Sequence, residues 1–472
     1  MAADFSRRIL LLTPPLVQPN TPYPATMHLK ASLDALGVES LQVDLSVKIL
    51  GDILRSYGGD AADELLEILS GRETSLEAKI SSSVQLEALA AEIRSKVDRL
   101  FGFSRYSQEE CLSLRDFGAL EKLVSRRGVL DDFLEARLFE VASKFRPTDV
   151  WVTCPFPGTV VGAFKIARFF KRAYPRVRLV LGGGFVNTEL RHMRDARPRK
   201  YFDLFAFDAF EKRPFLKPSY EGVDWDDYFD FCTDEDLSSL LWNSGRWIKL
   251  IMAQGCYWHK CAFCDVCLSY VGTFRMPEPG EIVDAMQELG TEFHFVDEAM
   301  PPALVDKVCD EIIKRRFDCV WWGNIRFDSA FTARLARKMA DAGCIAVTGA
   351  LECANDRLLG LMNKGITLAS ATKVLEAFKK AGIKVHAYLM YDFPTETKRE
   401  QKEAERYVKS LADRDLVQSA FWHRFALTVH SPIYKAPDRF SLEVEPVPKG
   451  PLFALNEMGY KRKCRTKNFR SL

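Results

Sequence analysis

Strand-like apolar runs followed by helical spacing recur six times in the second half of the chain. The first run is WIKLIMA at residues 247–253, and the last covers residues 420–429. Strands that alternate with helices in this way run parallel and are joined by right-handed crossovers. Six such units predict a sheet that closes, or nearly closes, into a partial (β/α)6 TIM barrel. Functional side chains of such barrels lie at the carboxyl ends of the strands.

A different α/β pattern occupies the first part of the chain. Its expected strands are residues 8–13, 41–45, 149–153, 178–181 and 204–207. Helical spacing lies between them, and the helix at residues 27–36 ends at Gly37, a natural cap. This order predicts an α/β domain with an open, doubly wound, Rossmann-like sheet. Residues 46–145 carry long helical spacing instead, which predicts an all-helical insertion.

An aperiodic stretch containing Pro214 and Pro218 separates the two patterns. Such a stretch suits a connection between domains. We therefore expect four parts, which are a first α/β domain at 1–215, a linker at 216–245, the barrel at 246–440 and a C-terminal extension at 441–472.

The overall charge excludes some classes of partner. The chain has 66 Lys and Arg against 64 Asp and Glu, a net charge of +2, which gives no electrostatic sign of binding to nucleic acid or an anionic membrane. No apolar run approaches the roughly 20 residues of a spanning helix, and residues 1–9 contain no signal-peptide core. We expect a cytoplasmic protein without a membrane partner. The basic run at residues 461–470 is typical of a solvated tail, with contact to an anionic substrate or RNA as the alternative.

Four of the twelve cysteines lie in one short stretch, GCYWHKCAFCDVC at residues 255–267, just after the first barrel strand. Thiolates this close can hold a metal centre with little loop-closure cost. Four of them could close a structural zinc site, whereas three could hold a 4Fe-4S cluster and leave one iron open. Zinc sites usually split their ligands into two separated pairs, which favours the cluster.

The cysteine stretch resembles the cluster motif of radical S-adenosylmethionine (SAM) enzymes, whose commonest spacing is C-x3-C-x2-C. An aromatic residue, Phe263, stands before Cys264 as in that motif, while the gap between Cys256 and Cys261 is one residue longer. The resemblance implies Cys256, Cys261 and Cys264 as the cluster ligands. The rival trio is Cys261, Cys264 and Cys267, whose spacing resembles the start of a bacterial ferredoxin run. In the favoured assignment Cys267 is either a buried thiol or a thiol that lies beside the ligands.

The resemblance extends to the ends of the later barrel strands, in the segments FHFVDEAM, WGNIRFD, GALECAND, LMNKGIT and YDFPTET. It implies that SAM is contacted by residues of these segments and of the cysteine stretch, namely Phe263, Asp297, Glu298, Arg326, Glu352 and Asp392. Asp392 stands where the family has glycine. An alternative is that Asp297, Glu298 and Arg326 form a structural ion pair. We assign no catalytic residue.

A doubly wound sheet ahead of such a barrel resembles the cobalamin-binding subfamily of radical SAM enzymes. The matching segments include RILLLTPP at 8–15 and VLGGGFVN at 180–187. The resemblance implies that the corrin or its nucleotide tail is lined by Thr13, Pro14, Gly182, Gly183 and Gly184. No D-x-H-x-x-G motif occurs, so no histidine is nominated as a cobalt ligand. Alternatively the sheet has lost cobalamin, and the glycines merely form a tight helix N-terminus.

The resemblance implies an enzyme in which a 4Fe-4S cluster cleaves SAM to a 5'-deoxyadenosyl radical, with electrons from an external donor such as flavodoxin or ferredoxin. We expect cobalamin-dependent methylation of an unactivated carbon in a peptide or small-molecule substrate. The alternatives are a cobalamin-independent rearrangement, cyclisation or crosslinking of a peptide or metabolite, and a zinc-stabilised binding protein without catalytic activity.

Overall fold

The computed structural model describes residues 7–208 and 217–463, which form two compact units. The first comprises the described residues up to Leu250 together with Gly450–Leu455, and the second comprises Ile251–Lys449 and the described residues from Asn456 onward. The division falls close to the predicted start of the barrel at residue 246.

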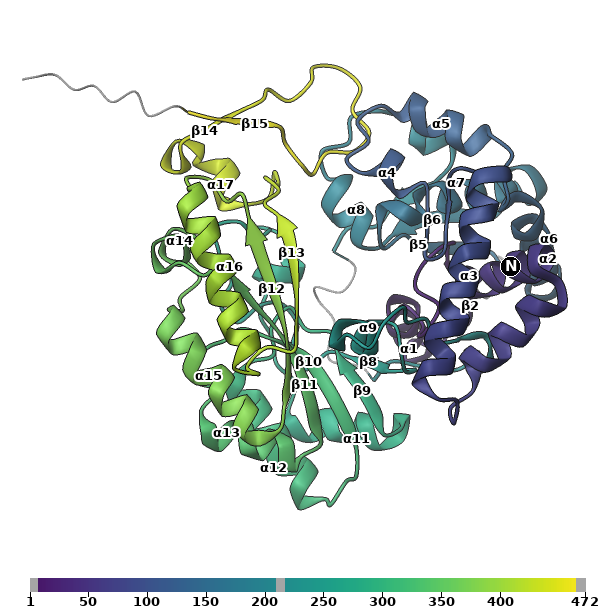
Figure 1. Cartoon of the computed structure of the whole chain (residues 1–472). Helices are drawn as coiled ribbons and strands as arrows, with labels where there is room; N and C mark the ends of the chain where they lie inside the picture. The colour runs from purple at the N-terminus through teal and green to yellow at the C-terminus, as the bar shows by residue number, and fades with distance from the viewer. Residues whose placement is uncertain (1–6, 209–216, 464–472) are drawn as a thin grey trace, which may run out of the picture. The chain divides into compact units, whose positions relative to one another are not determined.

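The first unit is built on a five-stranded parallel sheet with the order β2-β1-β5-β6-β7 (Figure 1). Its strands are β1 (Arg8–Thr13), β2 (Glu39–Asp44), β5 (Asp149–Thr153), β6 (Arg178–Gly182) and β7 (Leu204–Phe205). The helices α1 (Ala25–Asp34) and α7 (Val160–Ala173) connect strands of this sheet. Strand order reverses between β1 and β5, and ligands of doubly wound sheets bind at such a switch point. The predicted doubly wound α/β fold is confirmed.

The insertion between β2 and β5 contains helices and a short hairpin. Its helices are α2 (Leu45–Ser70), α3 (Leu76–Lys96), α4 (Gln108–Cys111), α5 (Phe117–Ser125) and α6 (Asp131–Phe145). Between α3 and α4, β3 (Phe101–Gly102) pairs with β4 (Arg105–Tyr106), so the expectation of an all-helical insertion was wrong. Strands of two residues are too short to show an alternating pattern in the sequence. The buried hydroxyl of Tyr106 donates to Asp98 over 2.7 Å and ties this hairpin down.

The described part of the expected linker, residues 217–245, packs within the first unit. It contains the short helix α9 (Leu237–Trp242). Tyr228 and Phe229 belong to the hydrophobic core of this unit. Lys79 of α3 donates to Asp230 over 2.6 Å, with both side chains nearly inaccessible. These contacts bind the segment to the insertion.

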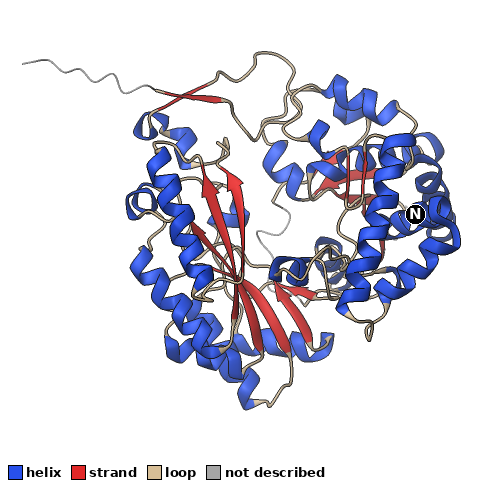
Figure 2. Cartoon of the chain, viewed as in Figure 1, coloured by secondary structure: helices blue, strands red, loops and turns tan. Residues whose placement is uncertain are grey.

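The predicted six-stranded barrel sheet has the order β13-β12-β11-β10-β9-β8 (Figure 2). Strands β9 to β13 pair in parallel and lie in the second unit, and β8 ends at the boundary residue Leu250. The strands are β8 (Ile248–Leu250), β9 (Glu292–Phe295), β10 (Val320–Ile325), β11 (Cys344–Glu352), β12 (Lys384–Tyr391) and β13 (Ser419–Arg424). Because β8 and β13 are the two edges, the sheet is an open, partial barrel.

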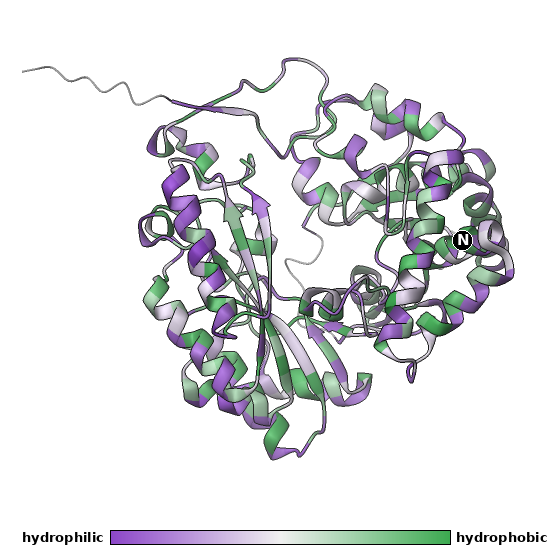
Figure 3. Cartoon of the chain, in the orientation of Figure 1, coloured by the Kyte–Doolittle hydropathy of each residue, from purple (hydrophilic) through white to green (hydrophobic). Residues whose placement is uncertain are grey.

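Helices follow these strands along the chain, as expected for βα units. They are α10 (Ser269–Gly272), α11 (Pro279–Leu289), α12 (Pro302–Lys314), α13 (Ala333–Asp341), α14 (Asp356–Leu361), α15 (Leu368–Ala381), α16 (Lys398–Asp413) and α17 (Pro432–Lys435). The side chains of Thr397 and Glu400 form a capping box at the start of α16. The buried residues of α16 are Ala404 and Leu411, and the helix is mainly hydrophilic in Figure 3.

The C-terminal segment forms the antiparallel pair β14 (Leu442–Val444) and β15 (Tyr460–Arg462). The last barrel strand was expected to run to residue 429, but it ends at Arg424. In the basic run, Arg462 binds Asp392 and Lys463 binds Asp438, so these two side chains do not belong to a free tail. Residues 464–470 of that run lie outside the described residues. Among the helices that the structure describes, none has the length and apolarity needed to cross a bilayer.

The buried ion pair between Asp131 and Lys165 provides a test of packing in the first unit. Lys165 Nζ lies 2.7 Å from both carboxylate oxygens of Asp131, and both side chains are almost fully buried. We predict that Asp131→Ala lowers the free energy of unfolding of this unit by about 3–5 kcal/mol, because it leaves a buried cation unpaired.

The matched control for this variant is Glu92→Ala, which removes the exposed pair between Glu92 and Lys96. Its cost should be below about 1 kcal/mol. Denaturant unfolding of both variants checks the prediction, and equal losses in the two variants would contradict it.

Candidate active site

The cysteine loop, defined here as residues 251–268, follows β8 and has no helix or strand of its own in the structure. A β-bridge between Gln254 and Arg275 fixes its first part through two backbone hydrogen bonds of 2.9 and 3.0 Å. The next residue, Gly255, has a φ of +74°, and a Cβ there would lie 2.2 Å from the carbonyl oxygen of Thr273. A glycine is therefore required immediately before Cys256.

Asp297, at the end of β9, holds the start of the cysteine loop. Its two carboxylate oxygens accept hydrogen bonds from the backbone amides of Met252 (2.9 Å) and Ala253 (2.7 Å). Burial raises the pKa of Asp297 to about 7. The structure thus assigns to Asp297 a structural contact, while its predicted contact with SAM stays a prediction. The neighbouring Glu298 is exposed.

The middle of the cysteine loop rests on the turn that follows α14. The indole of Trp258 donates to the carbonyl of Asn363 (2.8 Å), and the amide side chain of Asn363 donates to the carbonyl of Lys260 (2.9 Å). The backbone amide of Ala262 donates to Met362 over 2.8 Å. Gly365 has a φ of +74°, and a Cβ on it would lie 2.2 Å from the Trp258 ring. The segment LMNKGIT is therefore the support of this loop.

Two of the predicted ligands lie on one turn, in which the backbone amide of Cys264 donates to the carbonyl of Cys261 over 3.3 Å. Interaction with the Cys264 thiol, together with the nearby charges of Lys364 and Arg326, lowers the pKa of Cys261 to about 7. The same interaction raises the pKa of Cys264. Cys256 is half-buried, and within residues 7–208 and 217–463 no three His, Cys, Asp or Glu side chains are gathered as a ready metal site.

Cys267 points to a different partner. Its side chain is exposed, so the expectation of a buried thiol was wrong, and Sγ donates to the carbonyl of His430 over 3.0 Å. This thiol is therefore engaged with the segment after β13.

Lys364 is a functional candidate that the sequence reasoning did not single out, although it lies in the quoted segment LMNKGIT. Its ammonium group contacts Glu352 over 2.7 Å, and both side chains are buried. The same group lies 5.8 Å from the centre of the Phe263 ring. Glu352 has a left-handed φ of +65° beside a register shift in β11, which is the kind of strain found at functional sites. The carboxylate of Glu352 is thus held by Lys364, which lies on the turn that follows α14.

Arg326 is a buried cation beside the cysteine loop. It is 3% exposed, donates through Nη2 to the carbonyl of Lys364, and stacks 4.3 Å from the Trp258 ring centre. Nε and Nη1 make no hydrogen bond to any residue that the structure describes, and the ion pair to Asp328 is long at 3.9 Å. Buried donors without partners are costly, so a ligand anion at this point would stabilise them.

Asp392 follows β12 with a left-handed φ of +65°. Its carboxylate binds Arg424 over 2.8 Å and also binds Arg462. Its backbone amide donates to Glu396 over 2.6 Å. The side chain that replaces the expected glycine is therefore engaged by two arginines.

The residues expected to line cobalamin lie at the carboxyl ends of strands in the first unit. Thr13 and Pro14 are buried. A Cβ on Gly183 would lie 2.5 Å from the carbonyl oxygen of Cys154, and one on Gly184 would lie 2.8 Å from that of Pro155. Both glycines are thus required by packing within the chain. Gly182 is different, because a Cβ there would have its nearest neighbours at 3.7 Å.

The parallel barrel sheet and the cysteine loop that follows its first strand along the chain are the features of a radical SAM domain. Residues 250–408 match the radical SAM superfamily, so the chain carries such a domain.

Solved structures with the same fold include two of the radical SAM methyltransferase TsrM from Kitasatospora setae. One, with a tryptophan substrate and a SAM analogue bound, is 16% identical with a TM-score of 0.56, and the match covers 94% of this chain and 80% of that one. The other, with cobalamin and a [4Fe-4S] cluster bound, is 15% identical with a TM-score of 0.52, and the match covers 95% and 82%. At these identities the likeness is one of fold.

A curated relative is an uncharacterized methyltransferase of Pyrococcus horikoshii. It is 24% identical over 177 residues, which are 36% of this chain and 38% of that protein.

The contact between Gly365 and Trp258 gives a direct test of how the cysteine loop is held. We predict that Gly365→Ala destabilises the second unit by about 1–3 kcal/mol, because the methyl group meets the indole and the backbone is left-handed. It should also speed amide hydrogen exchange in residues 258–264, as measured by mass spectrometry. Gly360→Ala is the matched control, since a Cβ at Gly360 meets nothing within 4 Å. Unchanged exchange in Gly365→Ala would contradict the proposed support.

Proposed function

We propose that this chain is a radical SAM enzyme that methylates an unactivated carbon of a small-molecule or peptide substrate with the help of cobalamin. The ligands of its 4Fe-4S cluster are Cys256, Cys261 and Cys264. The observation that carries the proposal is the turn that brings Cys261 and Cys264 together through a backbone hydrogen bond of 3.3 Å, near the cations of Lys364 and Arg326, on the loop that follows the first barrel strand.

The donor chemistry of the loop fits an iron-sulfur cluster. Nearby cations favour thiolates, which are the form that binds metal. The bond between Cys267 and His430 supports three ligands instead of four, because that thiol is engaged outside the group. This argues against a zinc site closed by four thiolates.

The chain's own residues have three tasks at this site. Asp297 and Asn363 hold the cysteine loop through backbone hydrogen bonds. Arg326 offers the free donors Nε and Nη1 to the carboxylate of SAM. Tyr257 and Trp258 cover the guanidinium of Arg326 and keep water from it. When bound, the cluster supplies the electron that cleaves SAM to a 5'-deoxyadenosyl radical, and cobalamin supplies the methyl group.

The first unit fits cobalamin at the switch point between β1 and β5. Gly182 at the end of β6 is not required by packing, since a Cβ there would make only ordinary contact with Ala206 at 3.7 Å. Phe156, which is exposed, lies beside Tyr23 with a ring distance of 5.7 Å. Small residues and exposed aromatic rings suit the approach of a flat ligand. The cobalamin-independent reaction is the second candidate, because Gly183 and Gly184 are explained by internal packing alone.

Cysteine variants test the proposal after anaerobic reconstitution with iron and sulfide. We predict that Cys256→Ala, Cys261→Ala and Cys264→Ala each reduce SAM cleavage to background, because one thiolate fewer cannot hold the cluster. The matched control Cys267→Ala should keep both iron and SAM cleavage. Iron content, visible absorption and 5'-deoxyadenosine release are the measurements.

Two outcomes would contradict the assignment. Loss of iron in Cys267→Ala with retention of iron in Cys256→Ala would show that the ligands are Cys261, Cys264 and Cys267. A colourless protein that contains zinc would contradict the proposed enzymatic activity. Bound cobalamin, measured in the same preparation, decides between methylation and the cobalamin-independent reaction.

A further inference from the structure

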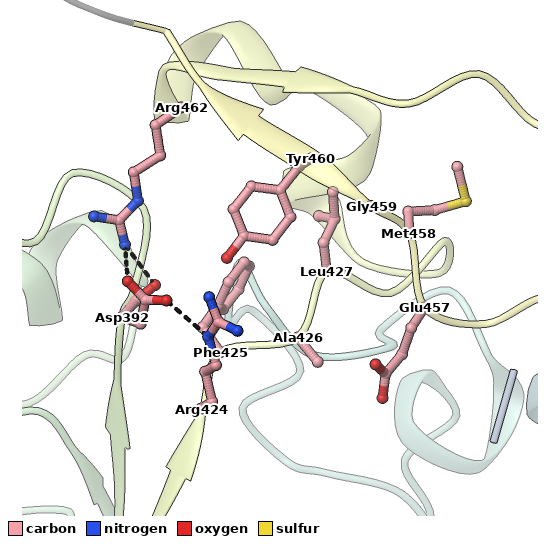
Figure 4. Close-up of a pocket in the computed structure, with 10 residues that line it drawn as sticks. All are labelled: Asp392, Arg424, Phe425, Ala426, Leu427, Glu457, Met458, Gly459, Tyr460 and Arg462. Atoms are coloured by element: carbon pink, nitrogen blue, oxygen red, sulfur yellow. Dashed lines mark hydrogen bonds and ion pairs between the residues drawn. The ribbon is translucent and has the colours of Figure 1, made fainter. Parts of the chain in front are cut away.

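A pocket of about 670 Å³ lies in the second unit where β12 and β13 end (Figure 4). One wall is Asp392 with the residues that follow β13, and the C-terminal segment forms the other wall. The lining residues are Asp392, Arg424, Phe425, Ala426, Leu427, Glu457, Met458, Gly459, Tyr460 and Arg462. This volume is typical of sites for small molecules.

The two arginines of the pocket have different surroundings. Arg462 donates to the carboxylate of Asp392 and to its backbone carbonyl (2.9 Å), so it joins the C-terminal segment to the turn after β12. Arg424 donates to Asp392 through Nε over 2.8 Å, and its side chain is 69% exposed. The pair of Nη groups of Arg424 has no hydrogen-bond partner within the described part of the chain.

The orientation of Arg424 suits an oxyanion. Asp392 holds the guanidinium by its Nε edge, and in Figure 4 the Nη groups lie on the side of Tyr460, whose hydroxyl is close enough to interact with Arg424 electrostatically. A guanidinium with two free parallel donors matches a carboxylate or a phosphate. Tyr460 adds a further donor, and its ring contacts that of Phe425 at 5.8 Å.

The charges of the lining favour a carboxylate over a phosphate. Arg424 and Arg462 are balanced by Asp392 and Glu457. Asp392 and Glu457 would repel a group with two or more negative charges, whereas a single carboxylate needs only the free donors of Arg424.

A hydrogen bond links the segment that lines the pocket to the cysteine loop. Leu427 lines the pocket, and the next residue, Thr428, donates to Asp265 of the cysteine loop. Thr428 also pairs with Glu457 of the opposite wall in a β-bridge. The wall of the pocket is therefore joined to the cysteine loop through Thr428.

We infer that this pocket binds the carboxylate of a small organic substrate, with Arg424 as the recognising group and Asp392 as the residue that orients it. Its identification as a substrate site rests on the proposed function, whereas the binding itself does not.

Binding of benzoate, compared with its neutral analogue benzamide, tests the inference on the full-length, reconstituted protein without SAM. Saturation-transfer NMR should detect benzoate at millimolar concentration and no benzamide. Arg424→Gln should weaken benzoate binding about tenfold or more, because it removes a charge-assisted hydrogen bond. Arg399→Gln is the matched control, since Arg399 is an exposed arginine in an ion pair with Glu403 over 2.7 Å on α16, and it should leave binding unchanged.

The inference would be overturned by the absence of benzoate binding in the unsubstituted protein, by equal binding of benzoate and benzamide, or by unchanged binding in Arg424→Gln. Displacement of benzoate by equimolar inorganic phosphate would assign the pocket to phosphate groups and also overturn it. Iron content of the same samples reports on the proposed function separately. If the reconstituted protein holds no iron but binds benzoate through Arg424, the proposed function is contradicted while the carboxylate-binding inference is supported.

Discussion

A loop without regular secondary structure must satisfy its backbone hydrogen bonds with other segments, and this constraint governs the cysteine loop. The carboxylate of Asp297 accepts from Met252 and Ala253 at its start. The turn at residues 361–365 contacts its middle through Trp258, Lys260 and Ala262. These contacts come from the ends of β9 and α14, so the barrel itself determines where the thiols lie.

The charges around the thiols follow from the same turn. Lys364 comes directly after Asn363, which holds the loop, and its ammonium group is buried beside Glu352 and near Cys261. Its carbonyl accepts from Arg326, whose ring partner Trp258 is again part of the loop. One short turn thereby supplies both the mechanical support of the cysteine loop and a cation for thiolates.

The order of elements could be read from the sequence because apolar periodicity and glycine positions are local signals. Both sheets contain the predicted strands in the predicted order along the chain, although the first and last barrel strands end earlier than the expected residues 253 and 429. The two-residue strands β3 and β4 carry no such periodicity and were missed. The packing of residues 217–245 on the insertion was also missed, because Tyr228 and Phe229 show their burial only in three dimensions.

The candidate site was only partly readable for the same reason. The cysteine spacing and the approximate ends of the strands could be predicted because both are local features of the sequence. The pairing of Glu352 with Lys364, the two backbone contacts of Asp297 and the arginines around Asp392 join residues distant in sequence. Asp297, Glu352 and Asp392, which were predicted to contact a cofactor, therefore have protein partners as well. Arg326, from the same predicted group, keeps two buried donors without a hydrogen-bond partner among the described residues.

The central claim is that three thiolates hold the cluster and leave one iron open to SAM. Electron paramagnetic resonance of the reduced, reconstituted protein, recorded with and without SAM, tests it most directly. The account predicts a single 4Fe-4S signal whose g values shift when SAM is added, in the unsubstituted protein and in Cys267→Ala alike. A spectrum that does not respond to SAM, or a protein without a paramagnetic iron-sulfur signal, would contradict it.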